Sequence, residues 1–317
     1  MLHNIAIIGA GQLGSRHLQG VKQSNSKLEI WAFDPCKESL AIAEERYNQV
    51  NSDTSHIVHF IQSIDEIPYN LDIVIIATSS KPRFSITKKM LLSHNIKYLI
   101  LEKFLFQRLS DYSIIEQLIQ EKNVKAYVNC PRRMFDSYQI IKENIDNKKT
   151  ITMSYANNDW GLCCNSIHYI DIFMYLCNGI NYELDIDGIE PKIIKSKREG
   201  YVELLGDIKI TTKGNCLTLG SYENFEGLAN VEIINGNTKI TYNESNGDLF
   251  INDKIYSSPI KYQSTLSGIL VDELIDLGSC RLSSYQESAI YHEIFLEKLI
   301  PYINQLQGIE SDSCPIT

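Results

Sequence analysis

The most informative segment of this chain is Asn4-Ile5-Ala6-Ile7-Ile8-Gly9-Ala10-Gly11-Gln12-Leu13-Gly14. Four apolar residues, Ile5–Ile8, predict a buried strand, and a G-x-G-x-x-G pattern that opens a helix follows directly. In this context Gly9 permits a tight turn, Gly11 lets the backbone approach a pyrophosphate, and Gly14 allows close helix–sheet contact. The free N–H groups of the helix N-terminus then face the anion. The residues predicted to bind a dinucleotide here are Gly9, Gly11, Gln12, Leu13 and Gly14.

Strand and helix signals alternate around this motif up to about residue 130. The strands are expected at Asn4–Ile8, Leu28–Phe33, Ile57–Phe60, Asp72–Thr78, Tyr98–Glu102 and Lys125–Asn129, and helical patterns include Lys37–Tyr47, Phe84–Ser93 and Asp111–Lys122. The nearly continuous apolar run Ile73–Ala77 is what a parallel sheet covered on both faces requires. We therefore predict an α/β chain whose first domain, residues 1–130, is a Rossmann domain with a doubly wound parallel sheet.

The pattern changes over residues 131–317. Alternating runs joined by hairpin-type turns predict a mostly antiparallel, open-faced sheet, with the runs at Val202–Leu205, Asp207–Thr212, Cys216–Ser221, Asn230–Ile234, Thr238–Tyr242 and Asp248–Ile251. Helices are expected near Asn165–Cys177, Ser264–Leu277 and Ser284–Gln305. This C-terminal α+β domain is the predicted substrate-binding domain. Because an open sheet leaves one face uncovered, we also expect a homodimer or homotetramer.

Composition excludes several classes of function. The chain has 317 residues, enough for about two domains, and its net charge of −9 argues against a nucleic-acid or polybasic membrane binder. No apolar run approaches the roughly 20 residues that span a bilayer. The eight cysteines form no C-x-x-C pair and no His cluster joins them at zinc spacing, so we expect no metal site and a reducing, cytoplasmic setting.

Asp34 is the candidate for cofactor choice. It lies 20 residues after Gly14, at the end of the second expected strand, where an acid holds ribose hydroxyls in dinucleotide-binding domains. A carboxylate there repels a 2′-phosphate, which favours NAD over NADP. Lys37 lies close by in the sequence and leaves the NADP alternative open.

Two further segments carry titratable residues suited to acid–base chemistry. Glu102-Lys103 ends the fifth strand, and the carboxyl ends of such strands line the ligand crevice, where an ammonium can polarise a hydroxyl. Asn165 and His168 share one helical face, and an imidazole suits proton transfer. The plainer interpretations are a solvated lysine after a strand and a hydrogen-bonded core histidine.

Together these segments resemble the Gfo/Idh/MocA oxidoreductases (glucose–fructose oxidoreductase, inositol dehydrogenase and rhizopine catabolism type) over essentially the whole chain. Arg16-His17 matches the Arg-His that often follows the glycine motif, and Ala77-Thr78 is similar to the Ala-Thr-Pro loop on the nicotinamide side. Glu102-Lys103 matches the Glu-Lys-Pro motif, with Phe104 in place of the proline. Asn165-x-x-His168-x-x-Asp171 resembles members that act on nucleotide-linked or amino sugars; polyol-oxidising members carry an Asp where this chain has Cys164.

The resemblance implies roles for these residues. Lys103 and His168 would be catalytic, His168 as general acid/base and Lys103 orienting the C–O bond. Thr78, Ser79 and Glu102 would surround the nicotinamide ribose. Asn165 and Asp171 would support the substrate or the histidine.

Two features are weaker. Arg132-Arg133, after the sixth strand, could contact an anionic substrate group or form a salt bridge; we take Arg133 as the candidate substrate contact. Trp160 is a candidate wall for a sugar ring.

The function expected from these residues is NAD-dependent hydride transfer to or from a secondary alcohol or ketone of a sugar or sugar nucleotide, with surface-polysaccharide or nonulosonate assembly as the biological setting. An NAD-binding protein without net redox turnover, either a cofactor-recycling enzyme or a redox-sensing partner, is the main alternative. A different nucleotide-binding activity, such as methyl transfer, is a third.

Overall fold

The computed structural model describes all residues, Met1–Thr317, and the chain forms two compact units. The first unit contains Met1–Phe106, Ser110–Pro131 and Lys261–Gln286, and the second contains Gln107–Leu109, Arg132–Ile260 and Glu287–Thr317. The mixed α/β fold class expected from the sequence is confirmed.

The first unit is built on a seven-stranded sheet with the order β16-β6-β5-β4-β1-β2-β3. Its strands β1 to β6 are parallel, and only β16 pairs antiparallel, with β6. The elements are β1 (His3–Ile8), α1 (Gln12–Val21), β2 (Leu28–Phe33), α2 (Lys37–Asn48), β3 (Ile57–Ile61), the 3₁₀ helix η1 (Ile64–Glu66), β4 (Asn70–Ile76), α3 (Ser80–Ser93), β5 (Asn95–Glu102), α4 (Leu109–Glu121), β6 (Lys125–Asn129), α7 (Gln263–Leu277) and β16 (Ser283–Ser284). Strand order reverses between β1 and β4, which creates the crevice where such folds bind ligands.

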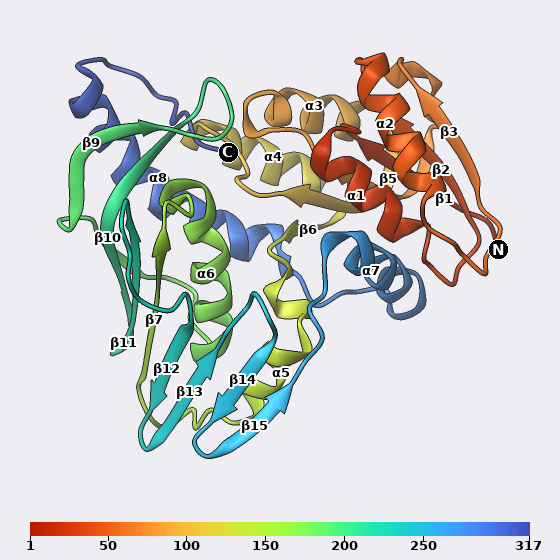
Figure 1. The fold of residues 1–317 in the computed structure, drawn as a ribbon. Coiled ribbons are helices and arrows are strands. Elements are labelled where there is room, and N and C mark those ends of the chain that lie inside the picture. Colours follow the sequence, from red (N-terminus) through yellow and green to blue (C-terminus); the bar gives the residue numbers. More distant parts are fainter. The chain divides into compact units, whose positions relative to one another are not determined.

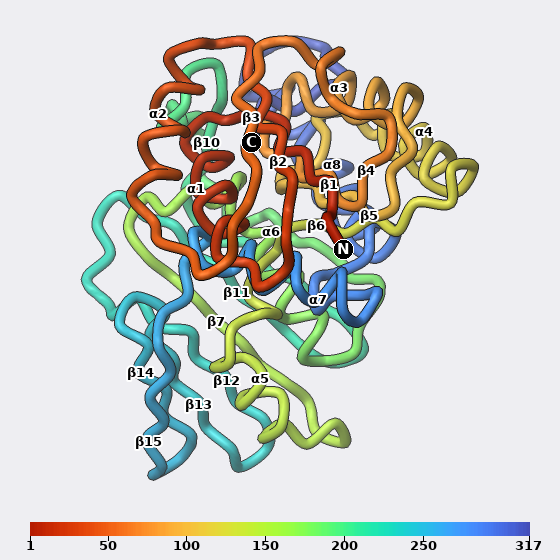
Figure 2. Tube along the Cα trace, turned by 90° about the vertical axis from the view of Figure 1, so that its right-hand side faces the viewer, coloured from red at the N-terminus to blue at the C-terminus, as the bar shows by residue number.

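Helices cover both faces of this sheet. Right-handed crossovers that run outward from β1 in one direction and from β4 in the other place α1 and α2 on one face and α3 and α4 on the opposite face. Figure 2 shows the two pairs on either side of the strands. The central strands are accordingly apolar on both sides, and Ile5–Ile8 and Ile73–Ile76 have no exposed surface.

Helix α7 returns from far along the sequence to pack against α1. The crossing is close because glycines meet there: a Cβ added to Gly268 would lie 2.5 Å from the carbonyl oxygen of Gly20. Asp272 of α7 also accepts hydrogen bonds from Ser24 Oγ at 2.5 Å and Asn25 Nδ2 at 2.9 Å. The sequence-based boundary at residue 130 assigned this helix to the second domain, whereas these contacts join it to the first unit.

The second unit is built on a nine-stranded sheet with the order β15-β14-β13-β12-β7-β11-β10-β8, and β9 also pairs with β10. All neighbours are antiparallel except β7 and β11, which are parallel. The elements are the 3₁₀ helix η2 (Pro131–Met134), α5 (Asp136–Glu143), β7 (Ile151–Asn158), α6 (Leu162–Cys177), β8 (Glu183–Asp185), β9 (Ile189–Lys195), β10 (Val202–Thr212), β11 (Asn215–Tyr222), β12 (Val231–Asn235), β13 (Thr238–Tyr242), β14 (Asp248–Ile251), β15 (Lys254–Ser257) and α8 (Tyr285–Gln307).

Helix α6 packs on one face of this sheet against β10 and β11 (Figure 1). Side chains alternate accordingly: Ile151 and Met153 of β7 are buried, while Thr152 and Ser154 are exposed on the opposite face. The sequence did not predict β7, α5, β8, β9 or β15. No helix combines the length and the apolar character that crossing a bilayer requires.

Candidate active site

The glycine-rich turn of the first unit has the shape of a phosphate cradle. Gly9 has φ +95°, and a Cβ there would lie 3.0 Å from Thr78 Cγ2. A Cβ on Gly14 would lie 1.7 Å from the Gly9 carbonyl oxygen, so α1 approaches the turn as closely as its backbone allows. A Cβ added to Gly11 would have no neighbouring heavy atom within 4 Å, and α1 begins directly after Gly11. The turn therefore fits a dinucleotide phosphate held by backbone N–H groups.

Asp34 directly follows β2 and lies beside this turn. Its two carboxylate oxygens accept hydrogen bonds from Ala10 N and Cys36 N, both at 2.9 Å. Arg46 of α2 steadies the same region from another side, because its guanidinium donates to Gln12 Oε1 at 2.7 Å and to Ser15 Oγ at 2.6 Å. The acid predicted to contact ribose is thus fixed by the loop that forms the phosphate cradle.

Thr78 and Ser79 follow β4 on the other side of the strand-order reversal. Thr78 Oγ1 is buried and forms no hydrogen bond within the protein, which leaves a polar atom for a ligand. Ser79 stands at the N-cap of α3 without capping it through its side chain. Both observations fit the nicotinamide-side contacts implied by the sequence.

The side chain of Glu102 is buried in a hydrogen-bond network and does not face an open crevice. Its Oε1 accepts from Asn129 Nδ2 and lies 2.8 Å from His17 Nε2, while His17 Nδ1 lies 2.9 Å from Ser267 Oγ of α7. Burial alone raises the pKa of Glu102, but the hydrogen bonds and charge of His17 outweigh it, with help from Asn129, so the pKa lies below its ordinary value. A cofactor contact from Glu102 would have to use Oε2.

Lys103 follows Glu102 on a tightly held segment. The peptide bond between Lys103 and Phe104, the residue that replaces the proline of the motif, is cis. Phe104–Phe106 are fully buried, and Arg83 of α3 donates to the carbonyl oxygens of Phe104 and Leu105. Lys103 itself stays partly exposed. The segment therefore presents the lysine from a rigid support.

In the second unit, α6 presents Asn165 and His168. Both are partly exposed, whereas the other residues from Leu162 to Met174 are buried. Asn165 Nδ2 donates to Trp160 O at 2.7 Å, and Glu203 of β10 accepts from the N–H groups of Cys163 and Cys164 at 2.7 and 3.2 Å. The predicted face is thus the accessible face of an otherwise buried helix.

Arg133 and Asp171 form an ion pair inside the second unit. Arg133 Nε and Nη2 donate to the two Asp171 oxygens at 2.9 and 2.8 Å, and Nη1 and Nη2 reach Glu287 at 3.2 and 2.9 Å. Asp171 has no exposed surface. Since carboxylates engage every guanidinium nitrogen, the geometry favours a structural role for Arg133 over the predicted substrate contact. The Asp171 carboxylate is likewise engaged by Arg133.

Trp160 belongs to an aromatic cluster beside α6. Its ring packs edge-on against Tyr155 and Tyr169, which stack on each other with centroids 4.4 Å apart. Tyr169 OH donates to Glu244, a carboxylate that also pairs with Arg132 at 2.6 Å. Burial raises the pKa of Glu244, but the charge and hydrogen bonds of Arg132 outweigh this and hold the pKa below its ordinary value. Trp160 itself is partly exposed.

The predicted site residues therefore divide between the two units. The first unit brings together the glycine turn, Asp34, Thr78, Ser79 and the Glu102-Lys103 segment. The second brings together Asn165, His168 and Trp160. Sequence reasoning missed Glu203 and Glu244, whose loop or strand positions give no local signal.

Comparisons with known proteins agree with the first unit's geometry. Residues 3–130 match the model of the Gfo/Idh/MocA family, an oxidoreductase family with an NAD-binding Rossmann fold. Over these residues the chain resembles the NAD-binding domain of that family. NAD is accordingly the cofactor that this domain binds, and the chain is a nicotinamide-dependent dehydrogenase or reductase. No curated protein sequence matches it.

Solved structures of this type resemble the chain along its length. An oxidoreductase from Agrobacterium radiobacter in complex with NAD⁺, L-tartaric acid and magnesium has a TM-score of 0.70 at 14% identity, covering 93% of this chain and 94% of its own. UDP-N-acetylglucosamine 3-dehydrogenase from Acidithiobacillus ferrooxidans has a TM-score of 0.69 at 12% identity, covering 94% and 100%. Biliverdin reductase from Synechocystis sp. PCC 6803 reaches 0.65 at 14% identity, covering 92% and 95%. At these identities the likeness concerns the fold.

Proposed function

We propose that this oxidoreductase interconverts a secondary alcohol and a ketone on a sugar or sugar-nucleotide substrate, using NAD. The observation that carries the proposal is the accessible Asn165–His168 face on a helix whose other residues over the same turns are buried. A core histidine would be enclosed like its neighbours. An imidazole left partly exposed, beside an amide, is suited to contact a polar substrate.

The cofactor would be held by the first unit. Backbone N–H groups after Gly11 receive the pyrophosphate, Asp34 receives ribose hydroxyls, and Thr78 and Ser79 offer hydroxyls on the nicotinamide side. When bound, the nicotinamide supplies or accepts the hydride. The proposal gives no role to a metal ion.

The protein's own residues would handle the proton. His168 takes the hydroxyl proton in the oxidising direction and returns it in the reducing direction, because a neutral imidazole is a base near physiological pH. Lys103 would donate a hydrogen bond to the same oxygen and stabilise its developing negative charge. Asn165 would position a neighbouring hydroxyl, and Trp160 would contact the apolar face of the sugar ring.

The substrate class rests on two supports. The Asn-x-x-His-x-x-Asp pattern at 165–171 resembles that of members acting on nucleotide-linked or amino sugars, and one structural neighbour is a UDP-N-acetylglucosamine 3-dehydrogenase. We accordingly propose a place in surface-polysaccharide or nonulosonate assembly. All eight cysteines are free thiols, which supports a reducing, cytoplasmic setting.

Steady-state kinetics test the proposal. Purified protein is mixed with NAD⁺ and a panel of sugar nucleotides, UDP-N-acetylglucosamine first, and formation of reduced nicotinamide is followed by absorbance. Lys103→Ala and His168→Ala should each lower turnover by roughly 10²–10⁴ while leaving NAD⁺ affinity nearly unchanged.

The matched control is Lys97→Ala, which removes an exposed lysine from β5, the strand that Lys103 follows, and should leave turnover intact. Wild-type turnover by His168→Ala would mean that His168 is structural. NAD⁺ binding without release of reduced nicotinamide on any substrate would favour the alternative of a protein without net redox turnover.

A further inference from the structure

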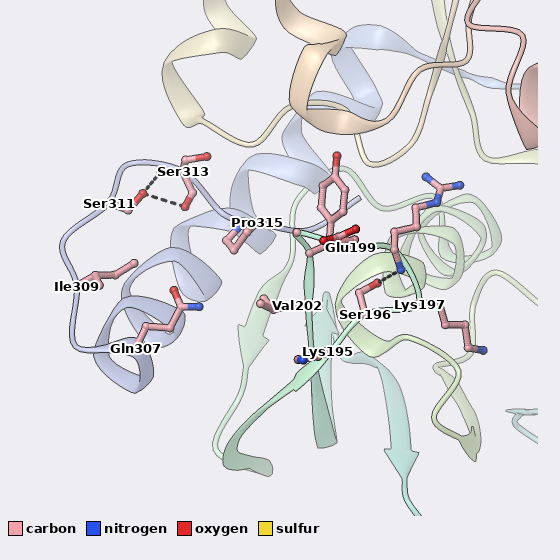
Figure 3. A pocket seen from close by; sticks show the side chains of 13 residues that line it. Lys195, Ser196, Lys197, Glu199, Val202, Gln307, Ile309, Ser311, Ser313 and Pro315 are labelled. Atoms are coloured by element: carbon pink, nitrogen blue, oxygen red, sulfur yellow. Dashed lines mark hydrogen bonds between the residues drawn. The ribbon is translucent and has the colours of Figure 1, made fainter. Parts of the chain in front are cut away.

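A hollow of about 880 Å³ lies between the turn that joins β9 to β10 and the segment that follows α8. Figure 3 shows Gln307, Ile309 and Ser311 on one side of it and Lys195 and Val202 on the strands across from them. All lining residues belong to the second unit. The volume lies in the range of pockets that hold small molecules, about 300–1,000 Å³.

Hydrogen bonds hold the walls of this hollow in place. Val202 N donates to Pro315 O at 2.9 Å and so ties the strand to the chain's last segment. Across the turn, Ser196 N donates to Tyr201 O at 3.1 Å. On the opposite wall, Ser313 N donates to Ser311 Oγ at 3.0 Å. The hollow is therefore framed by hydrogen bonds on both sides.

Three cations line the hollow without a carboxylate partner. Lys195, Lys197 and Arg198 fall within four consecutive residues, and all three side chains are exposed and form no ion pair. Lys192, on the same strand, is different because it pairs with Glu223 at 2.7 Å. Glu199 is the one acid in the lining, so the net charge of the wall is positive. In a chain with net charge −9, such a local excess of positive charge attracts an anion.

The lining also offers groups that suit a nucleotide. Tyr201 supplies an aromatic ring, and hydroxyls come from Ser196, Ser311 and Ser313. Aromatic rings stack on bases with little regard to sequence, and guanidinium and ammonium groups bind phosphate oxygens. An inorganic anion alone would not use the ring.

Strand β10 connects the hollow to α6, the helix that carries Asn165 and His168. Val202 in its wall is followed by Glu203, which accepts hydrogen bonds from the first-turn N–H groups of α6 at Cys163 and Cys164. Asn165 lies on that same first turn. A ligand that reaches from the hollow toward this turn would therefore be extended, as a sugar nucleotide is.

We propose that this hollow binds the nucleoside diphosphate part of a sugar-nucleotide substrate, with Lys195, Lys197 and Arg198 holding the phosphates and Tyr201 contacting the base. The assignment rests on the proposed function and names the substrate class within it. It makes the β9–β10 turn the element that distinguishes nucleotide-linked sugars from free sugars.

Calorimetric titration with UDP tests the site. Because the glycine turn also binds a diphosphate, the protein is first saturated with NAD⁺. We expect UDP to bind at one site and its affinity to fall as salt is raised. The variant K195A/K197A/R198A should bind UDP at least about tenfold more weakly and bind NAD⁺ as the wild type does.

A charge-matched control removes three exposed lysines elsewhere in the second unit, as K148A/K239A/K254A, and should leave UDP binding unchanged. Tyr201→Ala should weaken UDP but not inorganic pyrophosphate. UDP binding that NAD⁺ abolishes, or that both triple variants weaken equally, would overturn the assignment.

The same proteins separate this proposal from the proposed function. UDP binding that depends on the three cations, without hydride transfer to or from any sugar nucleotide, would support the proposed binding site and contradict the enzymatic role. Turnover of a free sugar with no UDP binding would sustain the enzymatic role and overturn the pocket.

Discussion

The carboxylate of Asp34 receives the N–H groups of Ala10 and Cys36, both at 2.9 Å, so the protein fixes its position beside the glycine turn. Each oxygen retains a lone pair that can accept from a ribose hydroxyl. The same negative charge opposes a 2′-phosphate. Cofactor preference is therefore expected to depend on this one side chain.

We predict that the wild type binds NAD⁺ more tightly than NADP⁺ and that Asp34→Asn narrows the difference by about tenfold or more. The amide keeps the shape of the side chain but removes its charge and one acceptor. Calorimetric titration of both proteins with both cofactors measures this. Equal or tighter NADP⁺ binding by the wild type would contradict the prediction and direct attention to Lys37, with Lys37→Ala as the next variant.

For single residues, the sequence located the candidate side chains better than it predicted their hydrogen-bond partners. Glu102 was recognised because it ends a strand at the ligand crevice. Its partner His17 lies 85 residues earlier in the chain, and Ser267, which binds the other side of that imidazole, lies 250 residues beyond His17. No local pattern reports such distant hydrogen bonds. For Arg133 the sequence left a substrate contact and a salt bridge open for the same reason, since Asp171 and Glu287 approach it from separate helices.

Among the elements, α6 depends most on buried charge. Arg133 joins η2, where it lies, to α6 through Asp171 and to α8 through Glu287. Burial lowers the pKa of Arg133, but the Asp171 and Glu287 carboxylates outweigh it and raise the pKa above the ordinary value. Removing Asp171 leaves the buried guanidinium with Glu287 as its one carboxylate partner in this network, which is more damaging than replacing Arg133 and Asp171 together.

We predict that Asp171→Ala lowers the free energy of unfolding by about 3–5 kcal/mol, whereas the double variant R133M/D171L loses much less. Urea denaturation measures both. In the fraction that remains folded, Asp171→Ala should retain the wild-type KM, because Asp171 contacts Arg133 and not the substrate. A raised KM with unchanged stability would show that Asp171 meets the substrate after all.

Element boundaries followed from the sequence where periodicity was uninterrupted. Strands β1 to β6 were predicted within a few residues because their apolar runs are continuous. Strand β10 was predicted as two runs, since Gly206 interrupts the pattern; in the structure the register shifts there and Gly206 has φ +105°. The interruption is a bulge within one strand, and a Cβ at Gly206 would lie 2.2 Å from Gly188 O. Strand β7 was missed because its apolar–polar alternation is short and gives way to the polar residues Asn157 and Asn158.

Across the whole molecule, the order of the elements along the chain does not follow the division into two structural units. The sequence predicted one domain boundary near residue 130. In the structure, α7 and β16 belong to the first unit although they follow the second sheet along the chain. Nothing in the composition of Gln263–Leu277 distinguishes a helix of one unit from a helix of the other. The decisive features are the glycine contact with α1 and the hydrogen bonds to Asp272, which appear only once the chain is folded.

The face of the nine-stranded sheet opposite α6 carries large exposed apolar side chains. Ile234, Phe250 and Ile255 are 53%, 39% and 74% exposed, and Phe250 and Ile255 lie directly opposite each other on β14 and β15. Large apolar side chains gathered on one sheet face are typical of an interface. We therefore expect a homo-oligomer that uses this face, and F250E/I255E should shift the mass measured by light scattering toward the monomer, because carboxylates buried without partners oppose association. Leu92→Glu, which alters an exposed apolar residue of the first unit, should leave the mass unchanged. A wild-type monomer at micromolar concentration, or an oligomer that survives F250E/I255E, would contradict the use of this face.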